Sequence, residues 1–152
     1  MRIAVFGSTG GVGRHVVAQA LKKGMAVTAL VRSPGKLADL PQGLTLVPGD
    51  VSDEEAVYYT VAGANAVVCA LGAPLQDKSG IRASGTAQII RAMKDACVDR
   101  LVCLSSIGAG DSYPLIPAHY KYLLGPLMME HMFADHEAQE AEIAASGLDW
   151  II

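Results

Sequence analysis

The sequence predicts one α/β domain in which a parallel sheet carries helices on both faces. Short apolar runs alternate with segments of helical period along all 152 residues, as they do in successive strand–helix–strand units. Apolar residues make up 51% of the chain and aromatic residues only 5%, a composition that suits strands buried on both faces and close helix packing. A chain of this length forms one ordinary core, so we expect a single domain over 1–152.

Short apolar runs predict the strands at residues 2–7, 26–32, 44–49, 66–71, 101–105 and 149–152. Each of the first five runs is followed by Gly, Ser or Asp, residues that commonly follow a strand. The last run reads as the start of a buried strand that stops without a turn or a cap. We therefore expect the C-terminal portion of the domain to be truncated.

Helical periodicity predicts helices over residues 12–23, 52–62, 84–97 and 127–145. Gly24 follows the first helix where a C-terminal cap belongs, and Ser52 with Glu55 opens the second as a capping box. The segment 107–126 contains glycines and prolines at too many positions for regular structure. We expect this segment to form the active-site loop.

Charge and composition disfavour several classes of partner. The net charge of -3 gives no broad basic field for nucleic acid. The chain has neither a charged and apolar leader nor a long uncharged span, so we expect no membrane association and a cytoplasmic location. The sequence leaves an oligomer open but does not indicate one.

No metal site is predicted. The three cysteines, Cys69, Cys97 and Cys103, lie in apolar runs without the spacing of a metal or redox motif, and they are expected to be small core residues. The histidines share no spacing with carboxylates that would suggest a metal.

The last helical segment carries two further patterns. The Met-rich stretch 123–133 is expected to be core, with a substrate lid or an oligomer contact as the alternatives. Glu137, Glu140 and Glu142 are expected to form a solvated helix face.

A glycine-rich turn joins the first predicted strand to the first helix. Gly7, Gly10 and Gly13 let the backbone turn tightly, bring amide N–H groups up to a pyrophosphate and allow the helix to pack closely on the sheet. A phosphate would then sit on the unpaired N–H groups of the helix start. A glycine-rich turn without a ligand is the alternative, but the order of strand, glycines and helix favours a dinucleotide in a Rossmann-type, doubly wound fold.

The end of the second strand predicts which dinucleotide is bound. An NAD-specific site places an acid about twenty residues after the glycines to hold the ribose hydroxyls. Arg32 and Ser33 stand there instead, and a guanidinium with a hydroxyl can bind a 2′-phosphate. NADP is therefore favoured over NAD, with a solvated loop charge as the alternative for Arg32. Asp50, after the third strand, either accepts from the adenine amino group or simply turns the chain into a helix.

Segments spread over the whole chain together resemble the atypical short-chain dehydrogenase/reductases. They are residues 7–13, 31–33, 49–51, 60–63, 70–72, 105–106 and 146–150. Within that family the flavin reductases of the biliverdin reductase B kind and the NmrA-like NAD(P)H-binding proteins are the most similar groups.

The resemblance implies a role for each part of the site. It assigns Gly7, Ser8, Thr9, Gly10 and Gly13 to the pyrophosphate, Arg32 and Ser33 to the 2′-phosphate, Asp50 and Val51 to the adenine, Leu71 and Gly72 to the ribose, Ser105 and Ser106 to the nicotinamide, and His136 to the substrate pocket.

Ser106 and His136 are the candidate catalytic residues. Ser106 would hydrogen-bond the carboxamide or an acceptor oxygen, and His136 would act as a donor or anchor an acidic substrate. The alternatives are a turn residue at the strand end for Ser106 and an exposed helical histidine for His136.

The Tyr-x-x-x-Lys pair of the extended short-chain enzymes is absent, because the tyrosines at 113, 120 and 122 are followed four positions later by Pro or Leu. We therefore expect an NADPH-dependent reductase in which the hydride passes directly to a flavin, a quinone or a similar small conjugated acceptor. An NmrA-like redox sensor that binds NADP without turnover is the alternative. An epimerase or dehydratase of nucleotide sugars is a third reading, which the missing pair disfavours.

Overall fold

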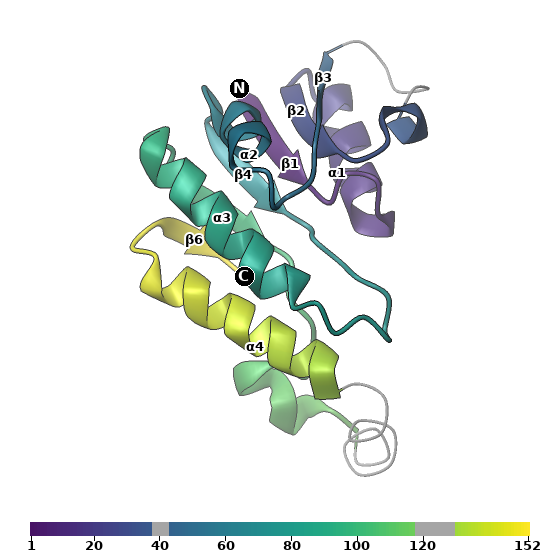
Figure 1. The fold of residues 1–152 in the computed structure, drawn as a ribbon, viewed down its shortest axis with the longest axis vertical. Helices are drawn as coiled ribbons and strands as arrows, with labels where there is room; N and C mark the ends of the chain where they lie inside the picture. Colours follow the sequence, from purple (N-terminus) through teal and green to yellow (C-terminus); the bar gives the residue numbers. More distant parts are fainter. Residues whose placement is uncertain (38–42, 118–129) are drawn as a thin grey trace.

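The computed structural model describes residues 1–37, 43–117 and 130–152, which form a six-stranded, all-parallel sheet flanked by helices (Figure 1). The strands are β1 (Arg2–Phe6), β2 (Ala26–Val31), β3 (Leu44–Pro48), β4 (Ala66–Cys69), β5 (Arg100–Cys103) and β6 (Asp149–Ile151). Their order in the sheet is β3-β2-β1-β4-β5-β6. The chain leaves β1 toward β2 and later returns to β4 on the other side, which opens a crevice at the carboxyl ends of β1 and β4. The predicted Rossmann-type, doubly wound sheet is confirmed.

Helices cover both faces of this sheet. They are α1 (Gly11–Lys22), α2 (Glu54–Val61), α3 (Ile81–Asp95) and α4 (Glu130–Ala145). The α1 helix packs on one face, and α2, α3 and α4 lie side by side on the other (Figure 1). Because strand side chains alternate, Val5 packs with Val17 of α1, whereas Phe6 packs with Ile89 of α3. No helix in the described ranges is both long and apolar enough to cross a membrane.

The α3 helix begins at Ile81, before the predicted start at residue 84. Its N-cap, Gly80, has a φ of 66° and no capping side chain of its own. The cap comes from α4, where the Asp135 carboxylate accepts from the backbone N–H of Arg82 at 3.2 Å and of Ala83 at 2.9 Å. A cap supplied by a residue this far along the chain leaves no local signal, so periodicity alone placed the start too late.

The same carboxylate forms a buried ion pair. Arg82 Nη1 lies 3.1 Å from Asp135 Oδ2, and each side chain is only 8% exposed. Arg82 Nη2 also donates to the carbonyl oxygen of Ala73, in the loop after β4. Asp135 therefore links α4 to the start of α3 through hydrogen bonds and an ion pair. Arg82 in turn links the start of α3 to the loop after β4.

Three expectations are wrong. First, residues within the segment 107–126 do adopt regular structure, as the 3₁₀ helix η2 (Gly110–Leu115). Another 3₁₀ helix, η1 (Pro34–Leu37), lies in a segment for which no structure was predicted. Second, the last strand forms but is not buried: Trp150 is 41% exposed because β6 is an edge strand in the described part of the sheet. Third, Cys97 is exposed, not core; it follows α3 with a φ of 53°, as a residue that ends a helix commonly does.

The turn from β1 into α1 depends on close backbone contacts. Gly7 has a φ of 74°, and a Cβ there would lie 2.1 Å from the carbonyl oxygen of Ala70. A Cβ on Gly13 would lie 2.1 Å from the carbonyl oxygen of Gly7. A Cβ on Gly11, in the same helix, would meet nothing within 4 Å. The fold therefore requires glycine at 7 and 13 but not at 11.

Replacing Gly13 with Ala is expected to lower the free energy of unfolding by at least about 2 kcal/mol, because the methyl group must displace backbone. Gly11→Ala adds the same methyl group to the same helix in open space and is expected to be neutral or to stabilise by up to about 1 kcal/mol. Urea unfolding followed by circular dichroism measures both variants. Equal losses of stability would contradict the close contact at Gly13.

Replacing Asp135 with Ala is expected to lower the free energy of unfolding by about 3–5 kcal/mol, because it leaves the Arg82 guanidinium buried without its partner. Asp149→Ala is the matched control. Its ion pair with Arg100 is short, at 2.6 Å, but the Asp149 side chain is 67% exposed. The control is therefore expected to cost about 1 kcal/mol or less. Denaturant unfolding compares the two variants. A similar loss of unfolding free energy in both would contradict the stabilising role of the buried Arg82–Asp135 ion pair.

Candidate functional site

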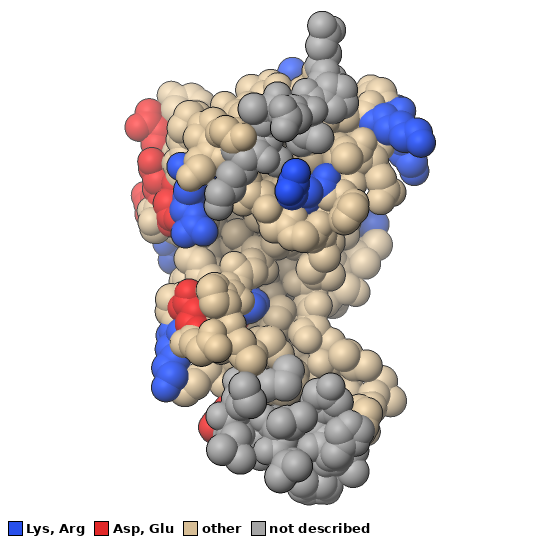
Figure 2. All heavy atoms as spheres, turned by 90° about the vertical axis from the view of Figure 1, so that its right-hand side faces the viewer, with Lys and Arg blue, Asp and Glu red and all other residues tan. Residues whose placement is uncertain are grey.

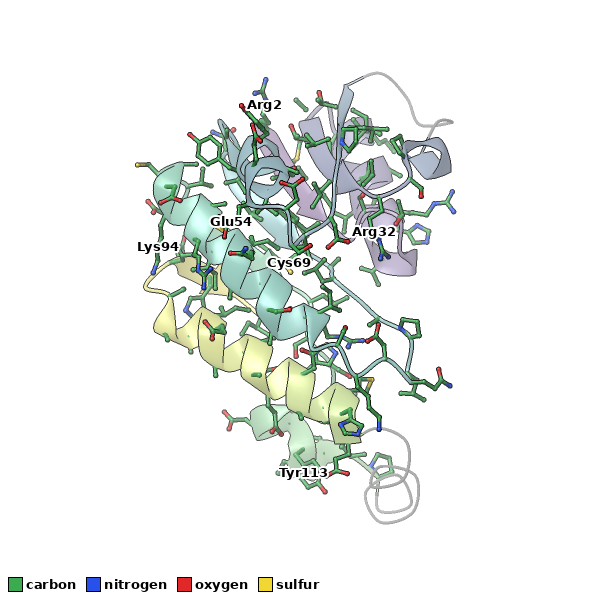
Figure 3. All side chains as sticks on the ribbon, in the orientation of Figure 1. Arg2, Arg32, Glu54, Cys69, Lys94 and Tyr113 are labelled. Carbon is green, nitrogen blue, oxygen red and sulfur yellow. The ribbon has the colours of Figure 1, made fainter. Side chains whose placement is uncertain are left out.

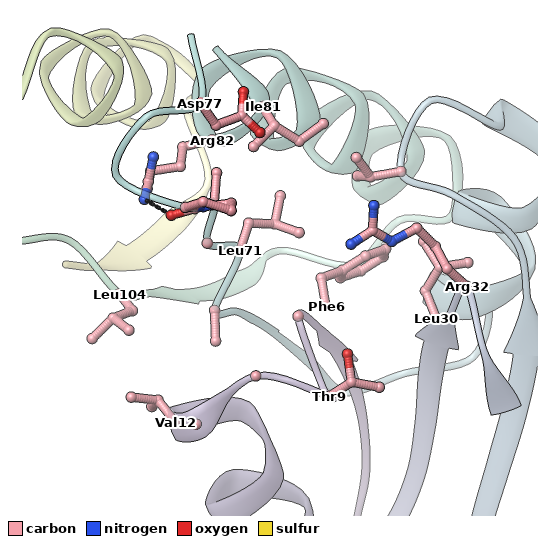
Figure 4. A pocket seen from close by; sticks show the side chains of 18 of the residues that line it. Phe6, Thr9, Val12, Leu30, Arg32, Leu71, Asp77, Ile81, Arg82 and Leu104 are labelled. Atoms are coloured by element: carbon pink, nitrogen blue, oxygen red, sulfur yellow. Dashed lines mark hydrogen bonds between the residues drawn. The ribbon is translucent and has the colours of Figure 1, made fainter. Parts of the chain in front are cut away.

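A cavity of about 900 Å³ lies along the edge of the sheet where the strands end. Residues that follow each of β1, β2, β3, β4 and β5 line it. Figure 2 shows this side of the molecule, which is hollowed across its middle. Figure 4 shows the interior, with Arg32 on one side and Arg82 and Leu104 on the other. The glycine turn and the predicted catalytic residues therefore share one cavity.

The start of α1 forms one end of this cavity. Gly7, Thr9, Gly10 and Gly11 line it. Gly10 is the N-cap of α1, and no side chain caps the first turn. The backbone N–H groups of that turn are therefore available to a phosphate, and the helix dipole favours its negative charge.

Two other residues of the turn do not line the cavity. The Ser8 hydroxyl donates to the carbonyl oxygen of Leu30 at 3.2 Å, and Ser8 is only 1% exposed. Gly13 packs against the backbone of Gly7. Both residues shape the turn, and their part in a pyrophosphate site stays a prediction.

Arg32 lies where β2 ends, on the outer side of the cavity (Figures 3 and 4). Its side chain is 82% exposed, and its Nε lies 3.8 Å from Asp50 Oδ2, which is longer than a hydrogen bond. Asp50 also accepts from the backbone N–H and the hydroxyl of Ser52. Ser33 is exposed beside Arg32 but is not among the residues that line the cavity. The structure thus brings Arg32 and Asp50 together in a loose, solvated ion pair.

Val51, Leu71 and Gly72 line the middle of the cavity. The α3 helix approaches them closely at Gly85, where a Cβ would lie 2.7 Å from Leu71 Cδ1 and 3.0 Å from Val51 Cγ1. A Cβ on Gly72 would meet nothing within 4 Å, so this stretch of backbone borders open space. These positions fit the predicted neighbours of an adenine and a ribose.

Ser105, Ser106 and His136 line the opposite end. The Ser105 hydroxyl donates to the Glu140 carboxylate, and the Ser106 hydroxyl donates to the carbonyl oxygen of Ile107 at 3.2 Å. His136 Nδ1 lies 3.3 Å from the Oε1 atom of a buried glutamine, Gln139. The two predicted catalytic residues therefore meet at one end of the cavity.

His136 is only 6% exposed, so its alternative reading as an exposed helical histidine is wrong. Burial lowers the pKa of His136, and the positive charge of Arg82 lowers it further, whereas Gln139 and the nearby acids act in the opposite direction. The imidazole is therefore neutral at pH 7.

Sequence analysis missed three residues at this end: Arg82, Gln139 and Glu140. Glu140 was expected on a solvated face, but it is half-buried and accepts from Ser105, whereas Glu137 is exposed as expected. Gln139 is fully buried and donates through Nε2 to a threonine of α3. A usable signal was present, because Gln139 lies on the same helical stripe as Ile143, which faces the core.

Two buried thiols lie in the strands beside this end. Cys69 and Cys103 are register partners in β4 and β5, and Figure 3 shows Cys69 between the sheet and α3. The hydrogen bond with the Cys103 thiol lowers the pKa of Cys69 to about 7, and the same bond together with burial raises the pKa of Cys103. Both are core residues, as predicted, and neither lines the cavity.

Across the described ranges, no three His, Cys, Asp or Glu side chains group as a metal ion would need. The predicted start of the last helix at residues 127–129 lies outside the residues that the structure describes. So do most of the Met-rich stretch and two of the tyrosines considered above.

Comparison with known proteins adds a family. The model of the NAD(P)H-binding family matches residues 7–152. The photosystem II assembly factor Ycf39 of Synechocystis sp. is 36% identical over 121 residues, which cover 77% of this chain and 37% of that protein. The isoflavone reductase homolog IRL of Zea mays is 40% identical over 80 residues, which cover 47% of this chain and 26% of that protein.

A solved structure supports the same fold. ChuY, an anaerobillin reductase from Escherichia coli O157:H7, aligns with a TM-score of 0.79 over 99% of this chain and 70% of its own, at 21% identity. The chain thus spans 37% or less of the two curated relatives. The family match covers the glycine turn, the middle of the cavity and its far end together. The chain therefore belongs to the NAD(P)H-binding family, as its sequence resemblance implied.

Proposed function

We propose that the chain is the nucleotide-binding part of an NADPH-dependent reductase whose substrate is a flat, conjugated acceptor such as a flavin or a quinone. The observation that carries the proposal is the single cavity that joins the uncapped start of α1 to Ser105, Ser106 and His136. When bound there, NADPH would supply a hydride. The chain itself would bind the cofactor, orient the acceptor and exclude water.

The residues at the first end fit a dinucleotide. The first-turn N–H groups of α1 have no capping side chain, and Gly11 and Gly72 both border open space in the cavity. Backbone amides at a helix N-terminus would hold the pyrophosphate, and the backbone around Gly72 leaves room for a ribose.

Arg32 supports NADPH over NADH. Its guanidinium stands at the end of β2, where an NAD-specific site would carry an acid. The side chain is exposed, and Asp50 holds it only loosely, at 3.8 Å. A 2′-phosphate carries more charge than the Asp50 carboxylate and accepts paired hydrogen bonds, so Arg32 would turn to it.

The far half of the cavity supports a flat, largely apolar acceptor. Leu104, which directly precedes Ser105, lines it and is 44% exposed, and the partly buried Ile81 lines the cavity as well. Exposed apolar side chains that face a cavity favour an apolar ring over water. Ser106 and the neutral His136 would fix the edge of that ring. Two of the relatives are themselves named reductases.

Replacing Arg32 with Asp is expected to weaken NADPH binding by about 10- to 100-fold, the effect of losing charge-assisted bonds, and NADH binding by less than about threefold. Arg91→Asp makes the same charge change on an exposed part of α3 that does not line the cavity, and it is expected to alter neither. Calorimetric titration with each cofactor measures both variants. Equal loss of NADPH and NADH binding would refute the 2′-phosphate assignment.

The reductase proposal predicts loss of NADPH absorbance when the chain, NADPH and FMN are mixed, at a rate that depends on protein concentration. The same mixture without protein corrects for direct reaction. Selective binding of NADPH without turnover of FMN or of a quinone would contradict the reductase. It would instead support a sensor that binds the cofactor and signals its redox state to another protein.

A further inference from the structure

Ser105, Ser106 and His136, which we call the far wall, present a fixed hydrogen-bonding polarity to the cavity. The Ser105 hydroxyl has one hydrogen, and it gives that hydrogen to the Glu140 carboxylate, which only accepts. Ser105 therefore has only its oxygen lone pairs to offer to the cavity.

Ser106 has the same polarity for a different reason. Its hydroxyl hydrogen goes to the carbonyl oxygen of Ile107, at 3.2 Å, and a carbonyl also only accepts. The second serine of the far wall is thus an acceptor as well.

The polarity of His136 is set by a chain of buried side chains. Gln139 is fully buried, and its Nε2 donates to Thr86 Oγ1 at 2.9 Å, which places Oε1 3.3 Å from His136 Nδ1. The amide oxygen only accepts, so the neutral ring carries its hydrogen on Nδ1. This leaves His136 Nε2 as an acceptor.

The charged groups near the far wall already have partners of their own. Arg82 lines the same end of the cavity, but it is 7% exposed, and two of its five N–H groups donate to Asp135 and to the carbonyl oxygen of Ala73. Asp77 also lines the cavity, is exposed, and adds a further acceptor. The carboxamide of a bound nicotinamide has one NH₂ group with two hydrogens, so it would satisfy at most two of the three acceptors.

We propose that the substrate of this cleft is a conjugated ring system that carries a ring N–H donor on the edge facing Ser105, Ser106 and His136. This inference rests on the proposed function and narrows it. A flavin has such a donor on its imide edge. A simple quinone only accepts, so it would leave the far wall unmatched, and buried polar groups left unpaired discriminate strongly between ligands.

Two flavins that differ by one methyl group test the proposal. Riboflavin carries the imide N–H, and 3-methylriboflavin has a methyl group in its place. Quenching of flavin fluorescence measures the dissociation constant of each with the whole chain saturated with NADP⁺. Riboflavin is expected to bind roughly 10-fold more tightly, the effect of one hydrogen bond to an otherwise unpaired acceptor in a partly desolvated cavity.

Glu140→Lys separates the hydrogen bond from the added bulk of the methyl group. A lysine ammonium only donates, so Ser105 can no longer give its hydrogen to position 140 and that hydrogen is free to point into the cavity. The preference for riboflavin is then expected to fall to about threefold or less. Glu137→Lys makes the same charge change on the exposed face of α4 and is expected to keep the full preference.

Equal affinity for the two flavins in the native chain would overturn the proposal, and so would an unchanged preference in Glu140→Lys. Oxidation of NADPH by riboflavin, measured in the same samples, tests the reductase function separately. A binding preference without oxidation would reject the reductase and support the acceptor polarity of the far wall. Oxidation without a preference would reject the polarity and support the reductase.

Discussion

The contact between Asp135 and the start of α3 sets the geometry of the cleft. One carboxylate caps two backbone N–H groups of α3 and neutralises the buried Arg82, so α4 cannot shift along α3 without leaving a buried charge unpaired. His136, Gln139 and Glu140 follow Asp135 within about one turn of the same helix. Their positions against the cavity are therefore consequences of this contact, which joins the last helix of the chain to a loop and a helix that precede β5.

Sequence reasoning succeeded where the signal is local. The turn at Gly7 and Gly13 can be identified within a few residues of the end of β1, because a tight turn restricts residue type at fixed positions. The assignment of Arg32 to a 2′-phosphate uses the same kind of local signal and stays a prediction. At the far end of the cavity, no residue type is restricted at a fixed position relative to a strand end. Ser105 meets Glu140 across 35 positions, and Gln139 reaches α3 across 53, through the packing of α4 on α3. Periodicity assigns a residue to a buried stripe but does not name its partner.

Arg32 and Asp50 show the same limit within the better-predicted half. Each was singled out separately, but their proximity follows from the pairing of β2 with β3, in which Val31 is the register partner of Pro48. Asp50 offsets part of the positive charge that makes Arg32 suitable for a phosphate. Because the ion pair is long and exposed, solvent screens it, and Arg32 would lose little free energy if its side chain turned away from Asp50. Under the proposed function, a 2′-phosphate would therefore compete with the Asp50 carboxylate for the Arg32 guanidinium.

The two ends of the cleft have opposite polarity. The uncapped start of α1 and Arg32 offer donors and positive charge, whereas Ser105, Ser106 and His136 offer acceptors. A ligand with phosphates at one end and N–H groups at the other would be matched in only one direction, since reversal would set phosphates against the acceptors of the far wall and leave the donors at α1 unpaired. In the proposed reductase, which has no Tyr-x-x-x-Lys pair to move a proton, orientation would be the main contribution of this chain to hydride transfer. The polarity of the cleft would supply it.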